Sequence, residues 1–258
     1  PNGQSFGPLS QIAVDSSGRV YVFQRSNPPV LVFSPEGVLI DTFGEGLFSD
    51  AHGIFVTRDD LILLVDRDAH EIIACESSGA VRFRLGQRHQ PQFNQPFNHP
   101  TDIAPAPNGD FYISDGYGNS NVHCFGADGV FRFSWGRQGS GPGEFTTPHA
   151  VWVDPSERVL VADRENNRVQ LFDLEGGFIE AWDDFYHPMD IFGDAQGNIF
   201  VTDQIPRLSM MSSEGRLIGR CRPVRFGAHG IGGDADGNLY LAETAPLDCV
   251  TRLRLLDH

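Results

Sequence analysis

The sequence predicts an all-β chain folded as a single six-bladed β-propeller. One strand-and-turn pattern recurs six times, its copies lie 40 to 49 residues apart, and each copy has room for about four short strands. About four strands in a repeat of roughly 40 residues is typical of a propeller blade. We expect one domain over residues 1–258, with blades starting near residues 8, 50, 99, 147, 187 and 227.

Each copy begins with a hairpin in which apolar and polar residues alternate around a turn rich in Gly, Asp and Asn. This alternation and these turns are typical of antiparallel strands. The six copies begin PLSQIAVDSSGRVYVFQR, DAHGIFVTRDDLILLVDR, HPTDIAPAPNGDFYISDG, TPHAVWVDPSERVLVADR, HPMDIFGDAQGNIFVTDQ and GAHGIGGDADGNLYLAET.

The sixth copy is shorter than the others. It ends at VTRLRLLDH after its third expected strand, and residues 1–6 align with a loop between blades and not with a strand. We therefore expect the last blade to be incomplete, or an N-terminal strand to be missing.

The formal net charge of −15 argues against nucleic-acid or anionic-membrane surfaces, which attract clustered Lys and Arg. No window offers the run of about 20 apolar residues that a membrane span needs. We expect no nucleic-acid partner, no membrane association and a monomer.

The four cysteines are scattered, without the CxxC spacing of a zinc or redox motif. We interpret them as buried free thiols, which favours a reducing compartment such as the cytoplasm. A secreted or periplasmic protein that has lost its signal stays open as an alternative.

One position of the repeat carries histidine in alternate copies. We call it the anchor, the residue two before the recurring aliphatic position; the anchors are Ser10, His52, Thr101, His149, Met189 and His229. Alternate blades of a six-bladed ring are about 120° apart, so the three histidines are expected to converge on the central axis. Three imidazoles with an open fourth position are typical of catalytic zinc, although iron, cobalt and nickel also accept imidazole. The alternative is three histidines with structural roles only.

Residues that follow the second strand of each hairpin are expected to return beside the anchor. Fourteen residues after the anchor, an acid stands in five of six copies, which favours a structural strand-end acceptor. A hydrogen bond from a metal-ligating imidazole to the acid stays open for Asp66, Asp163 and Glu243. The next positions hold Arg25, Arg67, Arg164 and Tyr117. Arginine fits a carboxylate through two parallel hydrogen bonds and stabilises a nearby phenolate.

The repeats, above all VADRENNRVQLFD, resemble the NHL family of propellers. Three further stretches, FNHPTDIAPAPNGDFYISDGYGNSNVHCF, WGRQGSGPGEFTTPHAVWV and AHGIGGDADGNLYLAE, resemble peptidyl-α-hydroxyglycine α-amidating lyase, the lyase domain of peptidylglycine α-amidating monooxygenase. The similarity runs from about His52 to Glu243. It is weaker before residue 50 and in the fifth blade.

This resemblance implies zinc held by His52, His149 and His229, with Tyr117, Arg164 and Arg25 as catalytic residues. The implied reaction cleaves a carbinolamide, N-acyl or ureido, to an amide and glyoxylate. Tyr117 would be the general base, Arg164 would stabilise its phenolate, and Arg25, with Arg67 beside it, would bind the carboxylate of a small-molecule substrate.

The sequence also departs from the family pattern. Gly118 replaces a disulfide-bonded cysteine, and Gly227 replaces a methionine near the site, which hints at a different substrate pocket. Gly230 replaces the aspartate that ligates a structural calcium in the family, which makes calcium doubtful here. Two other functions stay open, a propeller lactonase of the calcium type and a non-catalytic NHL interaction module.

Overall fold

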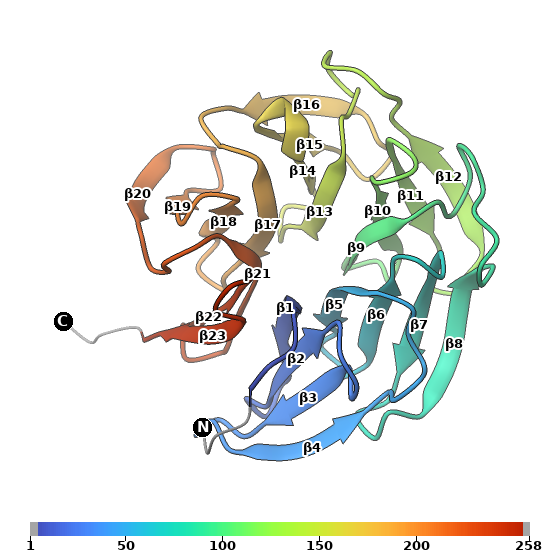
Figure 1. The fold of residues 1–258 in the computed structure, drawn as a ribbon. Coiled ribbons are helices and arrows are strands. Elements are labelled where there is room, and N and C mark those ends of the chain that lie inside the picture. The colour runs from blue at the N-terminus through green and yellow to red at the C-terminus, as the bar shows by residue number, and fades with distance from the viewer. Residues whose placement is uncertain (1–4, 255–258) are drawn as a thin grey trace.

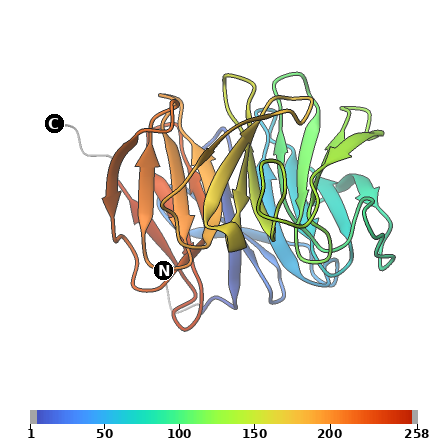
Figure 2. The same ribbon diagram turned by 90° about the horizontal axis from the view of Figure 1, so that it is seen from above.

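The computed structural model describes residues 5–254 and confirms the predicted six-bladed β-propeller. Six antiparallel sheets surround a central axis, and each sheet places its first strand innermost (Figure 1). Seen from the side, the strands run between two faces of a short cylinder, where the loops gather (Figure 2).

The first strand of each blade lines the axis and carries the anchor as its second residue. These inner strands are β1 (Leu9–Val14), β5 (Ala51–Val56), β9 (Pro100–Pro105), β13 (Pro148–Val153), β17 (Pro188–Gly193) and β21 (Ala228–Gly233).

The second and third strands form the buried middle of blades one to five, whereas in blade six the third strand is only partly buried. The second strands are β2 (Val20–Gln24), β6 (Ile62–Asp66), β10 (Phe111–Asp115), β14 (Val159–Asp163), β18 (Ile199–Asp203) and β22 (Leu239–Glu243). The third strands are β3 (Val30–Phe33), β7 (Glu71–Cys75), β11 (Asn121–Phe125), β15 (Arg168–Phe172), β19 (Leu208–Met211) and β23 (Cys249–Leu253). Their apolar side chains pack between neighbouring sheets, so the core is divided among the blades.

Five blades add an outer strand with an exposed face. These strands are β4 (Leu39–Phe43), β8 (Val81–Gly86), β12 (Phe131–Trp135), β16 (Phe178–Trp182) and β20 (Leu217–Cys221). Within residues 5–254 the sixth sheet has three strands, as the short sixth repeat predicts, and residues 1–4 lie outside the described part. Side chains of β1 and β2, among them Leu9 and Val22, pack against Tyr240 and Ala242 of β22 and so join the first and last blades.

An aspartate closes the first turn of several blades. In blade one, Asp15 accepts hydrogen bonds from the backbone N–H groups of Ser17 and Arg19 at 3.0 and 2.9 Å, and Gly18 takes a positive φ of 79°. Asp154, Asp194 and Asp234 accept equivalent pairs in blades four to six. A short polar side chain followed by a residue that tolerates positive φ is what such a turn requires, which explains the recurring motif.

All four cysteines are free thiols, as predicted, but only two of them are buried. Cys75 and Cys124 lie inside blades two and three, whereas Cys249 is partly exposed. Cys221 is exposed because it ends the outer strand β20, so the expectation that all four are buried is wrong for these last two. In the described part of the chain, no helix is long and apolar enough to cross a membrane.

Candidate metal centre

Three histidines from alternate blades meet on the propeller axis. His52, His149 and His229 come from β5, β13 and β21, and their ring centroids form a nearly equilateral triangle with sides of 5.0, 4.9 and 4.9 Å. One ligand atom from each ring lies within 4.8 Å of the others. The spatial convergence that the repeat spacing predicts is therefore present.

A β-bulge turns each anchor toward the axis. In blade four, Pro148 pairs with Asp163 and Ala150 pairs with Ala162, so His149 between them has no partner on β14. The same irregularity occurs at the anchor of the other five blades. A bulge inserts one unpaired residue and re-aims its side chain, so the anchor and the next residue can both face the channel.

Backbone carbonyls fix the tautomer of all three imidazoles. The Nδ1 atoms of His52, His149 and His229 lie 2.7, 2.6 and 2.9 Å from the carbonyl oxygens of Thr101, Met189 and Ser10. A carbonyl only accepts, so each Nδ1 carries a proton and each Nε2 keeps a lone pair that points inward. Each histidine is thus oriented by the backbone carbonyl of the anchor residue in the next blade of the ring.

The electrostatics of the site keep these imidazoles neutral. Burial, together with the other two histidines and Arg25, holds the pKa of His52 well below its usual range. Burial, His229 and Arg164 do the same for the pKa of His149. Burial and Arg25 lower the pKa of His229 to about 3. Three neutral Nε2 donors with inward lone pairs form a site that can hold a metal ion.

Tyr117 stands beside the open side of this tripod. Its hydroxyl lies 3.3 Å from Nε2 of His52 and 3.1 Å from Nε2 of His149, and Arg164 donates to it from Nη1 at 3.2 Å. The guanidinium groups of Arg67 and Arg164 lie 5.2 and 5.4 Å from the centre of the phenol ring. Tyr117 as a whole is 39% exposed, so the centre lies close to the protein surface on this side.

The predicted arginines Arg25 and Arg67 also lie beside the centre, and both contact the carboxylate of Asp50. Nε of Arg25 and Nε of Arg67 lie 3.3 and 3.2 Å from the two oxygens of Asp50. Arg67 also donates to Asp68 at 2.8 Å. Burial raises the pKa of the Asp50 carboxyl, an effect that both arginines oppose.

The acids fourteen residues after the anchor are structural. Asp66 accepts the backbone N–H groups of Ser49 and Asp50, and Asp163 accepts that of Thr146. Glu243 accepts the N–H of Arg225. Each acid thereby fastens the loop that leads into its inner strand, as the strand-end interpretation predicts. None of the three bonds a tripod imidazole among the described residues, whose Nδ1 atoms are already held by carbonyls.

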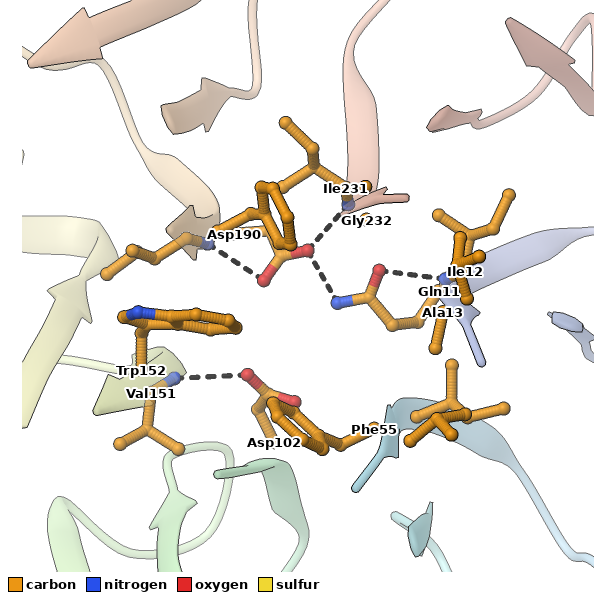
Figure 3. A pocket seen from close by; sticks show the side chains of 16 residues that line it. Gln11, Ile12, Ala13, Phe55, Asp102, Val151, Trp152, Asp190, Ile231 and Gly232 are labelled. Carbon is orange, nitrogen blue, oxygen red and sulfur yellow. Dashed lines mark hydrogen bonds between the residues drawn. The ribbon is translucent and has the colours of Figure 1, made fainter. Parts of the chain in front are cut away.

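A second polar layer lies in the channel beside the tripod. Gln11, Asp102 and Asp190 follow the anchors of blades one, three and five and point into a cavity of about 120 Å³ that Trp152 and Phe55 also line (Figure 3). Asp190 accepts from Gln11 Nε2 and from the N–H groups of Ile191 and Ile231. Asp102 accepts from the N–H of Val151 at 3.1 Å.

Burial dominates the titration of both carboxyls in this layer. It raises the pKa of Asp190 to about 7. Burial and the charge of Asp190 raise the pKa of Asp102 well above its usual value. These two acids are therefore far more costly to ionise than surface carboxyls.

The calcium site of the resembling family does not fit this channel. A Cβ at Gly230 would lie 2.0 Å from Oε1 and 2.7 Å from Cα of Gln11, so the side chain and backbone of blade one fill the space that an aspartate would need. Gln11 Oε1 accepts the N–H of Ile12, which leaves the amide engaged.

Sequence reasoning missed three groups of residues at this centre. The carbonyls of the alternate anchors leave no side-chain signal. Asp102 and Asp190 follow their anchors directly, so simple strand alternation would have pointed them away from the axis. Asp50 stands two residues before His52, and its N–H donates to Asp66 at 3.0 Å; its signal was an acid before an anchor histidine, which no other copy has.

Comparisons with known proteins agree with this architecture. A family model described as a 6-bladed beta-propeller matches residues 103–204. A human relative, NHL repeat-containing protein 3, is 30% identical over 78% of this chain and 64% of its own length. The solved streptogramin B lyase structure superposes with a TM-score of 0.71 over 99% of this chain and 86% of its own, at 15% identity, which shows the fold alone. By class, the chain is a six-bladed β-propeller with NHL-repeat relatives.

Within that class the chain resembles the amidating lyases. Rat peptidylglycine alpha-amidating monooxygenase is 27% identical over 92% of this chain and 29% of its own length. A Caenorhabditis elegans protein named probable peptidyl-alpha-hydroxyglycine alpha-amidating lyase is 29% identical over 66% of this chain and 56% of its own length. The resemblance stated from the motifs is confirmed. The chain spans less than two thirds of the length of each of these relatives.

Proposed function

We propose that this protein is a zinc-dependent lyase that cleaves an α-hydroxyglycine-type carbinolamide to an amide and glyoxylate. The observation that carries the proposal is the position of the Tyr117 hydroxyl, 3.3 and 3.1 Å from two Nε2 atoms of the tripod and bonded to Arg164. A base beside a three-histidine centre can remove a proton from a hydroxyl that is held there. Relatives named as amidating lyases support the same reaction class.

The residues of this chain would divide the reaction as follows. Tyr117, as phenolate, takes the proton of the carbinol hydroxyl. The carbinol oxygen forms the new C=O bond of glyoxylate while the C–N bond breaks, and the electron pair of that bond goes to the amide nitrogen. The Tyr117 hydroxyl returns its proton to this nitrogen, so atoms and charge balance. Zinc, held by the three histidines, would act as the Lewis acid that stabilises negative charge on the substrate oxygen.

The arginines would prepare the base and hold the substrate. Arg164 donates to the Tyr117 oxygen, so its positive charge lies beside the atom that would accept the substrate's proton. Nε of Arg25 donates to the carbonyl of Ala51, directly before His52, so its charge lies beside the centre and would attract the carboxylate of a substrate held there. A guanidinium group and a carboxylate match in shape and charge.

The test is release of glyoxylate from α-hydroxyhippurate and from ureidoglycolate by protein loaded with zinc. We expect turnover with at least one of them, and loss of turnover after chelation that returns when zinc is added. If protein with full zinc occupancy releases no glyoxylate from either, the lyase proposal fails.

A non-catalytic interaction module is the second candidate, since the human relative carries an NHL-repeat name. That function predicts no stoichiometric metal. Metal analysis of purified protein separates the two candidates, because the lyase requires close to one metal ion per chain.

A further inference from the structure

Asp50 lies between two guanidinium groups that come from different blades. Arg25 follows β2 and Arg67 follows β6, and each faces one oxygen of the Asp50 carboxylate, at 3.3 and 3.2 Å. The side chain of Asp50 is only 13% exposed. Its backbone is fixed as well, because its N–H donates to Asp66 and its carbonyl accepts the N–H of Arg67.

Both arginines use their Nε edge for these contacts. Nε of Arg25 also donates to the carbonyl of Ala51 at 3.3 Å, and Nε of Arg67 donates to Asp68. Among residues 5–254, neither arginine donates a hydrogen bond from its terminal Nη groups. One carboxylate therefore forms ion pairs with two guanidinium groups, its Oδ2 has no hydrogen-bond partner among the described residues, and the Nη donors of both arginines stay available.

The Nη donors of Arg25 and Arg67 are on side chains that lie beside the metal centre. Nε of Arg25 donates to the carbonyl of Ala51, the residue directly before His52, and the guanidinium group of Arg67 lies 5.2 Å from the centre of the Tyr117 ring. Asp50 and Asp68 together balance the charges of Arg25 and Arg67, so what the two arginines offer a further oxyanion is their unused Nη donors and not an excess of positive charge. Parallel N–H donors of guanidinium groups suit a planar oxyanion.

We propose that Asp50 is a positioning residue that holds Arg25 and Arg67 as one oxyanion-binding pair, whose ligand is the carboxylate of a small α-hydroxy acid. The inference rests on the proposed function, because it takes this carboxylate to be that of the carbinolamide substrate. Asp50 itself does not touch the reacting atoms. It acts by keeping two long, flexible side chains in one arrangement, so that binding does not have to order them.

The chain offers a matched control in Asp68. Both aspartates face Nε of Arg67, but Asp68 contacts that arginine alone and its side chain is 46% exposed. Asp50→Asn and Asp68→Asn make the same chemical change. An amide at position 50 has only one oxygen, so it can hold one guanidinium group and turns N–H donors toward the other.

The probe is glycolate binding to zinc-loaded protein by calorimetry, with uncharged glycolamide beside it. We expect Asp50→Asn to weaken glycolate binding by about 10-fold or more, with glycolamide changed by less than about 2-fold. Asp68→Asn is expected to change glycolate binding by less than about 3-fold. For a turned-over substrate, Asp50→Asn raises KM more than it lowers kcat.

Arg67→Met probes the same pair without altering Asp50. It is expected to weaken glycolate binding like Asp50→Asn, and the double variant is expected to lose little more, because the two residues act as a unit. Equal zinc content and melting temperature show that each variant is folded. If Asp50→Asn fails to fold, Arg67→Met against Asp68→Asn decides the question.

Unchanged or tighter glycolate binding by Asp50→Asn would overturn the inference, since Asp50 would then be only a competing charge. The proposed function fails separately. If glycolate binding depends on Asp50 but the protein releases no glyoxylate, the arginine-pair inference stands and the lyase proposal fails. If wild type and folded Asp50→Asn release glyoxylate equally, the lyase proposal stands and the role of Asp50 fails.

Discussion

The two layers of the central channel are built from the same positions of the repeat but have opposite chemistry. Blades two, four and six place histidine at the anchor and Gly53, Ala150 or Gly230 directly after it. Blades one, three and five place a residue without imidazole at the anchor and Gln11, Asp102 or Asp190 after it. One layer thus offers three neutral nitrogen bases, and the other offers an amide and two carboxyls.

The layer of Gln11, Asp102 and Asp190 depends on small residues in the histidine blades. A Cβ at Gly53 would lie 2.9 Å from Asp102 Oδ1, and a Cβ at Gly230 would lie 2.0 Å from Gln11 Oε1. The bulge at every anchor lets two consecutive residues face the channel, and in the histidine blades the second of the two is glycine or alanine. Blades with an anchor histidine therefore alternate around the ring with blades that carry Gln or Asp after the anchor. The histidines, whose pKa values are lowered, and the carboxyls, whose pKa values are raised, thus lie in different layers of the channel.

The largest expected effect comes from removing one imidazole. His149→Ala should lose stoichiometric metal and all turnover, because loss of an outer-shell partner alone costs about 10- to 100-fold in metal affinity and loss of a ligand costs more. Metal analysis and the glyoxylate assay measure the effect. His89→Asn is the control, since His89 is an exposed loop residue with φ of 57°, which asparagine tolerates. Equal metal content in His149→Ala and wild type would refute the metal centre.

The next effect tests the base beside the tripod. Tyr117→Phe keeps the ring between Arg67 and Arg164 but removes the hydroxyl, so kcat should fall by about 100-fold or more while metal content is unchanged. Tyr186→Phe is the matched control, because Tyr186 is 49% exposed and makes no hydrogen bond through its hydroxyl among the described residues. Turnover by Tyr117→Phe at the wild-type rate would exclude Tyr117 as the base.

A smaller effect concerns the carboxyl layer and the pH dependence of folding. The folded-state pKa of Asp102 is raised above its unfolded value, so the stability that the protonated group contributes is lost as pH rises toward its folded pKa. Asp102→Asn should make the unfolding free energy fall less between pH 5 and 7.5 than it does in the wild type. Urea unfolding at both pH values, at equal metal content, measures it. The same pH dependence in both proteins would contradict the burial argument.

The smallest expected effect tests the room between the layers. Gly230→Ala forces a Cβ against Gln11 and should lower the unfolding free energy by about 1 to 3 kcal/mol. Gly219→Ala is the control, because nothing lies within 4 Å of the Cβ that it would add. If both substitutions are equally neutral, the layers are less tightly packed than the structure shows.

Much of the centre was predictable because the chain repeats. A lone histidine in TTPHAVWVD carries little information, but six aligned copies place His52, His149 and His229 at equivalent positions. The hairpin register then brings Tyr117 and the arginines back beside them, as the structure shows for the pairing of Pro148 with Asp163.

Periodicity and turns that are local in the chain were enough to predict the six blades, the alternate-blade tripod and the three strands expected in the last repeat. Which residues share the channel, and how they are held, became clear only from the folded molecule. The bulges, the carbonyls that fix each imidazole, and the bridge from Asp50 to Arg25 all join different blades or break strand alternation. Such contacts depend on side-chain packing between segments far apart in the chain, which a local pattern does not encode.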